Sequence, residues 1–270
     1  MSAPQLGNLS QRVLSAAVGL PLLVLVIWAG GPLLGAVAII AAALALHEAL
    51  SLLFRAGWRP LVAEGIAWGA ALVILAAFRP GLFWLGLAVG ASAVFVAAAV
   101  RYRAAVLPVW GATAMGAAYI ALPLSSVVAL RDGTAGLEWL LVAFLGTFAT
   151  DTGAYAVGRL LGRHRMAPSI SPGKTWEGAA GGLLAGTAAV TALLALLGGI
   201  PFVIWAAVLL GLAVAIVSQA GDLLESKLKR LAGAKDSGRL IPGHGGLLDR
   251  LDSLVLVFPL IYYATLVWPA

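Results

Sequence analysis

The sequence predicts an all-α fold, a polytopic helical bundle integral to a membrane. Its 270 residues are 62% hydrophobic and only 10% charged, and the mean hydropathy is +1.02. Apolar runs of roughly 20 residues, the length that a helix needs to cross a bilayer, recur along the chain. The runs do not alternate between polar and apolar residues, as the strands of a membrane β-barrel would. Because no segment resembles a soluble domain, residues 1–270 are predicted to form a single membrane domain.

About nine membrane crossings are expected, each bounded by glycine, proline or charged residues. The first two crossings are separated only by Gly30, Gly31 and Pro32, which predict a tight turn. An alternative for the first crossing is a cleaved signal peptide with Arg12 in its charged region. The many crossings that follow, and the distribution of charge, favour a retained helix. The expected limits are 13–30, 32–54, 61–78, 81–100, 106–130, 136–157, 175–198, 200–218 and 251–269.

The basic residues indicate how these helices are oriented. If the N-terminus lies in the cytoplasm, all 17 Lys and Arg residues except Arg79 and Arg131 fall on the cytoplasmic side. This bias follows the positive-inside rule and predicts an N-in, C-out topology. We therefore expect a protein of the cell (inner) membrane whose longest polar loops, 158–174 and 219–250, face the cytoplasm and contribute to one active site.

The net charge of +6 is explained by this topology and by contact with anionic membrane lipids, so no nucleic-acid partner is expected. The chain has no cysteine. That excludes disulfides, cysteine-ligated zinc and thiol catalysis.

The segment from Ser218 to Asp252 holds the densest cluster of charges in the chain. Bases alone would bind an anion, so the acids among them indicate a divalent cation that acts together with the bases on phosphate. The cluster therefore predicts phosphate chemistry at the membrane surface. Its acids are Asp222, Glu225, Asp236, Asp249 and Asp252, and its bases are Lys227, Lys229, Arg230, Lys235, Arg239 and Arg250.

In the first part of this segment, the polar residues are spaced three or four apart, as on one face of a helix. If the eighth helix continues past Gly221, one face carries Ser218, Asp222, Glu225, Ser226 and Lys229. Glu225 is interpreted as the solvent-exposed partner of Lys229. Asp222 is predicted to be functional because it lies near the cytoplasmic end of the helix, at headgroup depth.

The second part of the segment leads into the last crossing. Asp249 and Asp252 suit a helix N-terminus by themselves, but a second pair of acids on the same side as Asp222 favours a role in the site. The preceding His244, Gly245 and Gly246 predict a loop whose N–H groups converge on one point, as in anion-binding nests. Three scattered histidines make a zinc site improbable, and oxygen ligands suit magnesium.

The loop 158–174 ends in Ser171-Pro172-Gly173-Lys174-Thr175. A P-loop is excluded because its first glycine would fall at Pro168 and no strand is predicted before it. The string instead predicts a turn that places Lys174 and Thr175 at a helix N-terminus, a natural anion site. Arg163 belongs to the same basic loop.

Three further features are expected to have weaker roles. Gly178, Gly182 and Gly186 predict close helix packing, within the bundle or in a dimer. Asp151 is a minor site candidate that also suits a packed polar residue. The acids of the remaining apolar segments are expected to snorkel or to pair; they are Glu48, Glu64 and Glu138.

With these residues the chain resembles the phosphatidate cytidylyltransferase family, also called CDP-diacylglycerol synthases. The resemblance rests on the run from Ser226 through Lys229-Arg230, Lys235-Asp236 and His244-Gly245-Gly246 to Asp249-Arg250-Leu251-Asp252. The string from Ser171 to Gly178, with Asp151-Thr152-Gly153-Ala154-Tyr155 upstream, is also similar to bacterial members. The N-terminal half is similar only in length and hydropathy.

The resemblance implies transfer of a cytidylyl group from CTP to phosphatidate, giving CDP-diacylglycerol and pyrophosphate, by a membrane-embedded homodimer. It also implies that Asp222 and Asp249 hold Mg2+, alone or with a second cation. The expected catalytic residues are Asp222, Asp249, Lys229, Lys235 and Arg250. The expected substrate-binding residues are Ser226, Arg230, His244, Gly245, Gly246, Lys174, Arg163, Ser171 and Asp252.

Two alternatives remain from the sequence. One is a cytidylyltransferase acting on another membrane lipid phosphate. The other, from a different class, is an anion transporter, which would place ionisable residues near the bilayer midplane, whereas here they gather at cytoplasmic helix ends.

Overall fold

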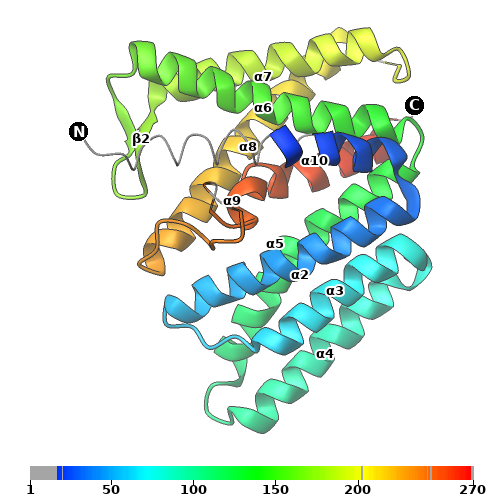
Figure 1. The fold of residues 1–270 in the computed structure, drawn as a ribbon, viewed down its shortest axis with the longest axis vertical. Coiled ribbons are helices and arrows are strands. Elements are labelled where there is room, and N and C mark those ends of the chain that lie inside the picture. The colour runs from blue at the N-terminus through cyan, green and yellow to red at the C-terminus, as the bar shows by residue number, and fades with distance from the viewer. Residues whose placement is uncertain (1–16, 20, 202, 242, 244, 269–270) are drawn as a thin grey trace. The chain divides into compact units, whose positions relative to one another are not determined.

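The computed structural model describes residues 17–19, 21–201, 203–241, 243 and 245–268, and most of them are helical (Figure 1). The chain divides into two compact units. The first comprises residues 1–128 and 231–251, and the second comprises residues 129–230 and 252–270.

Six described helices are long and apolar enough to cross a membrane. Three shorter apolar helices, Ala17–Ala29, Val62–Phe78 and Leu254–Val267, accompany them. The prediction of an all-α membrane protein is therefore confirmed, while the count of nine crossings and their orientation stay predictions. The start of the first predicted crossing, 13–16, lies outside the described residues. The six helices are Gly31–Arg55, Pro80–Arg101, Val106–Asp132, Gly136–Leu161, Trp176–Leu197 and Ile204–Leu231.

The first unit is built around α2 (Gly31–Arg55), whose buried face consists of small and aliphatic residues such as Ala42, Leu46 and Leu50. Glycine lets α3 (Val62–Phe78) approach α2 closely, because a Cβ on Gly65 would lie 2.8 Å from Leu50. The short 3-10 helix η1 (Pro80–Leu82) leads into α4 (Phe83–Arg101), and α5 (Val106–Asp132) follows. The same unit contains the chain from Leu231 to Leu251, which ends in the short helix α9 (Leu248–Leu251).

The second unit contains α6 (Gly136–Leu161), α7 (Trp176–Leu197), α8 (Ile204–Leu231, through Arg230) and α10 (Leu254–Val267). In Figure 1, α6 and α7 run side by side for most of their length.

The predicted glycine stripe lies in this packed interface. A Cβ on Gly182 would come within 2.9 Å of the Thr150 carbonyl oxygen on α6, and one on Gly186 within 3.0 Å of Ala215 on α8. The close-packing interpretation of the stripe is therefore confirmed within the chain.

A small β-hairpin joins α6 to α7, where only a loop was expected. Its strands are β1 (Arg165–Ala167) and β2 (Ser171–Thr175), which pair antiparallel with Arg165 opposite Thr175. The Thr175 hydroxyl accepts a hydrogen bond from the Gly178 N–H at 3.1 Å and so caps α7. The helix begins at Trp176, one residue after the expected limit of 175. Thr175 caps its N-terminus as predicted, while Lys174 lies on β2.

Candidate active site

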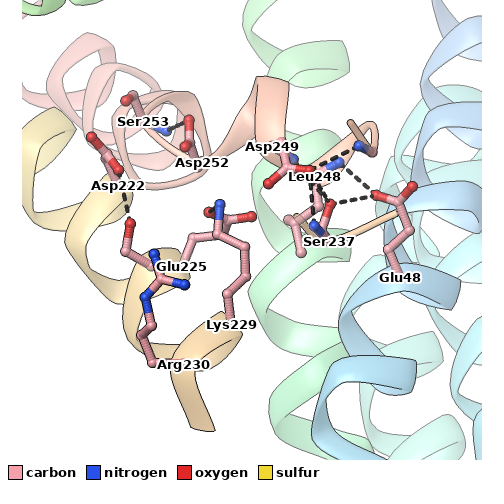
Figure 2. Close-up of polar contacts among 12 residues, drawn as sticks. Glu48, Asp222, Glu225, Lys229, Arg230, Ser237, Leu248, Asp249, Asp252 and Ser253 are labelled. Carbon is pink, nitrogen blue, oxygen red and sulfur yellow. Dashed lines mark hydrogen bonds and ion pairs between the residues drawn. The ribbon is translucent and has the colours of Figure 1, made fainter. Parts of the chain in front are cut away.

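Asp222 is positioned by the uninterrupted helix α8, which continues past Gly221 and beyond the expected limit of 218. Asp222 Oδ1 accepts a hydrogen bond of 3.3 Å from the Ser226 hydroxyl one turn further along (Figure 2). Asp222 Oδ2 lies 2.6 Å from Lys174 Nζ, which the hairpin supplies. The structure thus brings together three predicted site residues, an acid, a hydroxyl and a base, from two separate segments.

Asp222 and Lys174 line a pocket of about 580 Å³ in the second unit. A volume of this size suits a small-molecule ligand, and the mixture of acids and bases suits a ligand that carries phosphate together with a cation. Asp151, the minor candidate, lies on this pocket and interacts electrostatically with Asp222 and Lys174. The charged and polar lining residues include Asp151, Tyr155, Arg159, Arg165, Lys174 and Asp222.

Asp252 joins this group of acids from the turn between α9 and α10. A Cβ on Gly221 would collide with the Asp252 carbonyl oxygen, so α8 packs directly on the turn. The Asp252 carboxylate accepts a 2.7 Å hydrogen bond from the Ser253 N–H. The half-buried Asp252 side chain lies close enough to Asp222 to interact with it electrostatically. Negative charge is therefore unfavourable here until a cation balances it.

Asp249 lies in the first unit, where backbone groups of the 231–251 segment surround it. Its Oδ2 accepts hydrogen bonds from the Ser237 N–H at 2.9 Å, the Ser237 hydroxyl at 2.9 Å and the Gly246 N–H at 2.8 Å (Figure 2). Gly245 has a φ of 83°, and a Cβ there would lie 2.6 Å from the same oxygen. The predicted glycine loop thus directs an N–H group to a carboxylate of the protein itself. His244 lies outside the described residues.

Glu48 on α2 is a residue of this network that the sequence analysis missed. Its side chain is buried and accepts hydrogen bonds from the Leu247 N–H at 3.2 Å and the Leu248 N–H at 2.8 Å. The expectation that it snorkels is wrong. The signal in the sequence was its position, because Glu48 lies inside an apolar run, seven residues before α2 ends at Arg55. Ionisable residues within membrane-spanning helices commonly have a functional role.

Glu225 and Lys229 form the predicted ion pair on α8. Their predicted exposure to solvent is wrong, because the exposed fractions of the side chains are 0% for Glu225 and 12% for Lys229. Lys229 is consequently held within the protein by a carboxylate.

The remaining predicted residues are distributed over both units. In the second, Arg230 Nε donates a 3.1 Å hydrogen bond to the Ile170 carbonyl oxygen and so joins α8 to the hairpin turn. The Arg163 side chain is exposed, and the backbone N–H of Arg163 donates a hydrogen bond to the Glu177 carboxylate. Ser171 is the first residue of β2. In the first unit, Lys235 and Arg250 are exposed.

The described residues contain no group of three or more His, Cys, Asp or Glu side chains close enough to form a ready-made metal site. Within each unit, however, carboxylate oxygens are the ligands present, and these suit Mg2+. A shared ion between Asp222 in the second unit and Asp249 in the first stays a prediction.

Comparison with known proteins agrees with this chemistry. The family model described as "Cytidylyltransferase family" matches residues 10–268. A phosphatidate cytidylyltransferase of Brucella suis is 40% identical over 220 residues, which cover 80% of this chain and 74% of that protein. The phosphatidate cytidylyltransferase of Staphylococcus haemolyticus is 44% identical over 147 residues, covering 54% of this chain and 55% of that protein. The chain thus spans only about half the length of several of the curated relatives that it matches.

Proposed function

Because the chain belongs to the cytidylyltransferase family, we propose that it transfers a cytidylyl group from CTP to phosphatidate and releases pyrophosphate. The product would be CDP-diacylglycerol, a precursor in phospholipid biosynthesis. The observation that carries the proposal is the pairing of Lys174 with Asp222 on a pocket lined by further acids and bases. The names of the relatives support the choice of substrates.

The proposed reaction is a phosphoryl transfer between two anions. An oxygen of the lipid phosphate bonds to the α-phosphorus of CTP. The bond from that phosphorus to the oxygen bridging to the β-phosphate breaks, and pyrophosphate leaves with the bonding electrons. The nucleophile is already ionised, so no strong general base is needed. Positioning of the reactants and neutralisation of their charge supply the rate enhancement.

The bases of the site are proposed to neutralise this charge. Lys174 lines the pocket and would bind triphosphate oxygens. Arg163 and Ser171, from the segment between α6 and α7, would assist it. The exposed Arg230, Lys235 and Arg250 would reach the phosphates of either substrate. Lys229, paired with the buried Glu225, would add positive charge from within the protein. Ser226 orients Asp222 through its hydrogen bond.

A magnesium ion, alone or with a second cation, is the proposed cofactor. Asp222 and Asp249 would hold it, and Asp252 adds negative charge beside Asp222. When bound, the ion would withdraw charge from the phosphate oxygens.

The membrane arrangement is also part of the proposal. Nine crossings with the N-terminus in the cytoplasm would place the pocket at the cytoplasmic face of the inner membrane. Phosphatidate would then approach laterally between helices with its phosphate at the interface. The resemblance further implies a homodimer.

The decisive experiment incubates the purified protein with radiolabelled CTP, Mg2+ and a lipid acceptor. Labelled lipid is expected with phosphatidate and not with an isoprenoid phosphate or an archaeal ether-lipid phosphate. Absence of labelled lipid with phosphatidate would refute the proposed substrate, and labelling of another acceptor alone would identify the alternative enzyme.

A further inference from the structure

We propose that Glu48 is a positioning residue that holds Asp249 in its working orientation through Ser237 and the backbone at residues 246–248. The inference rests on the proposed function only in treating Asp249 as a ligand of the cation. Glu48 would thus give the N-terminal half of the chain a role in the site, although the active-site motifs all lie in the C-terminal half.

The two carboxylates share the donors of one short segment. Three consecutive N–H groups are divided between them: Gly246 donates to Asp249, whereas Leu247 and Leu248 donate to Glu48. The Ser237 hydroxyl lies 2.9 Å from Asp249 Oδ2 and 3.1 Å from Glu48 Oε2 (Figure 2). Movement of either carboxylate therefore alters the donors available to the other.

The segment packs directly against the Glu48 carboxylate. A Cβ on Gly238 would collide with Glu48 Oε1, and one on Gly246 would lie 2.6 Å from the same oxygen. Only glycine permits this approach at the two positions. The close fit indicates that the backbone is built around the carboxylate and that the carboxylate does not merely fill space.

A carboxylate is required because both of its oxygens accept. Oε1 accepts from the Leu247 N–H, and Oε2 accepts from the Leu248 N–H and shares the single Ser237 hydroxyl proton with Asp249. Glutamine has the same shape but replaces one acceptor with an NH2 donor, which would face an N–H group. The Leu247 or Leu248 N–H group would then be buried without an acceptor, which is unfavourable. Residues 246–248 would shift to avoid this, and Asp249 would shift with them.

The test compares Glu48→Gln with Glu64→Gln, a matched control that removes a carboxylate of α3 paired with Arg101 in the same unit. Glu48→Gln is expected to raise the Mg2+ concentration for half-maximal activity about 10-fold or more, with the KM for phosphatidate unchanged. Hydrogen exchange at residues 245–249 is expected to accelerate, and exchange in α3 to stay at the wild-type rate. Glu64→Gln should behave as wild type in both measurements. Wild-type Mg2+ dependence and exchange in Glu48→Gln would overturn the inference.

Two further measurements separate positioning from simple loss of fold and from failure of the proposed function. Ser237→Ala removes the shared hydroxyl without touching Glu48, and its effect on exchange at residues 245–249 should be non-additive with that of Glu48→Gln. Strict additivity would overturn the inference. Neither hydrogen exchange nor Mn2+ binding, which is measured by electron paramagnetic resonance, depends on turnover. They would show the effect of Glu48→Gln even if the protein acts on a different lipid.

Discussion

Lys174 Nζ on β2 lies 2.6 Å from Asp222 Oδ2 on α8. The pair joins the hairpin to α8, which contributes Asp222, one of the two acids that line the pocket. A cation bound by Asp222 would compete with Lys174 for the carboxylate and release the ammonium group toward phosphate. The two binding events would therefore assist one another.

Replacement of Lys174 tests this relationship. Lys174→Met is expected to lower kcat/KM for CTP about 10- to 100-fold, because a charged hydrogen bond to phosphate is lost. Steady-state kinetics with labelled CTP measure the effect. The control is Lys227→Met, which removes an exposed base of α8 and should retain nearly full activity. Equal losses in the two variants would contradict a specific role for Lys174.

The acids predicted to hold the cation should be indispensable. Asp222→Asn and Asp249→Asn each keep the size of the side chain and remove its charge, so labelled product should disappear while the protein elutes normally on size-exclusion chromatography. Removal of the cation with EDTA should abolish activity, and added Mg2+ should restore it. If both variants remain active, the proposed cation ligands are incorrect.

The buried pair on α8 predicts an effect on stability. Either Glu225→Ala or Lys229→Ala leaves an uncompensated charge, at a cost of about 3–5 kcal/mol. Thermal unfolding in detergent should show a clear loss in each variant. The double variant Glu225→Met/Lys229→Met removes both charges and should be more stable than either single variant. Additive losses would indicate that the residues do not act as a pair.

The packing of α7 predicts a second effect on stability. Gly186→Leu places a side chain where Thr150 and Ala215 leave no room, so the thermal midpoint should fall substantially. Gly111→Leu on α5 is the matched control, because nothing lies within 4 Å of a Cβ at Gly111. A similar decrease in both variants would argue against tight packing at Gly186.

The sequence predicts the long helices well because apolar length and breakers such as Pro80 are local signals, and α2 to α7 begin and end within a few residues of the expected limits. The end of α8 is the exception, because the helix runs on to Leu231 and not to 218. It also predicts the face of α8 that carries Asp222 and Ser226, since helical spacing determines that face. The hairpin was missed because its strands are short, and β2 contains Pro172 and Gly173 without an alternating pattern.

Glu48 was missed for a different reason. Its partners lie about two hundred residues away in the sequence, and only tertiary packing brings them together. The buried position of Glu225 could not be derived either, because a spacing of four residues predicts an ion pair but not its exposure.

The glycine contacts between α6 and α7 have a consequence for how the pocket would admit a ligand. Helices α6 and α7 pack backbone to backbone at these glycines, so they resist separation, and the wall of the pocket that they form is rigid. The hairpin, by contrast, is attached to α8 through contacts such as the Arg230–Ile170 hydrogen bond and the Lys174–Asp222 pair, which water and phosphate can replace. A bulky ligand would thus widen the cavity at least cost by lifting the strands, leaving the helical scaffold in place.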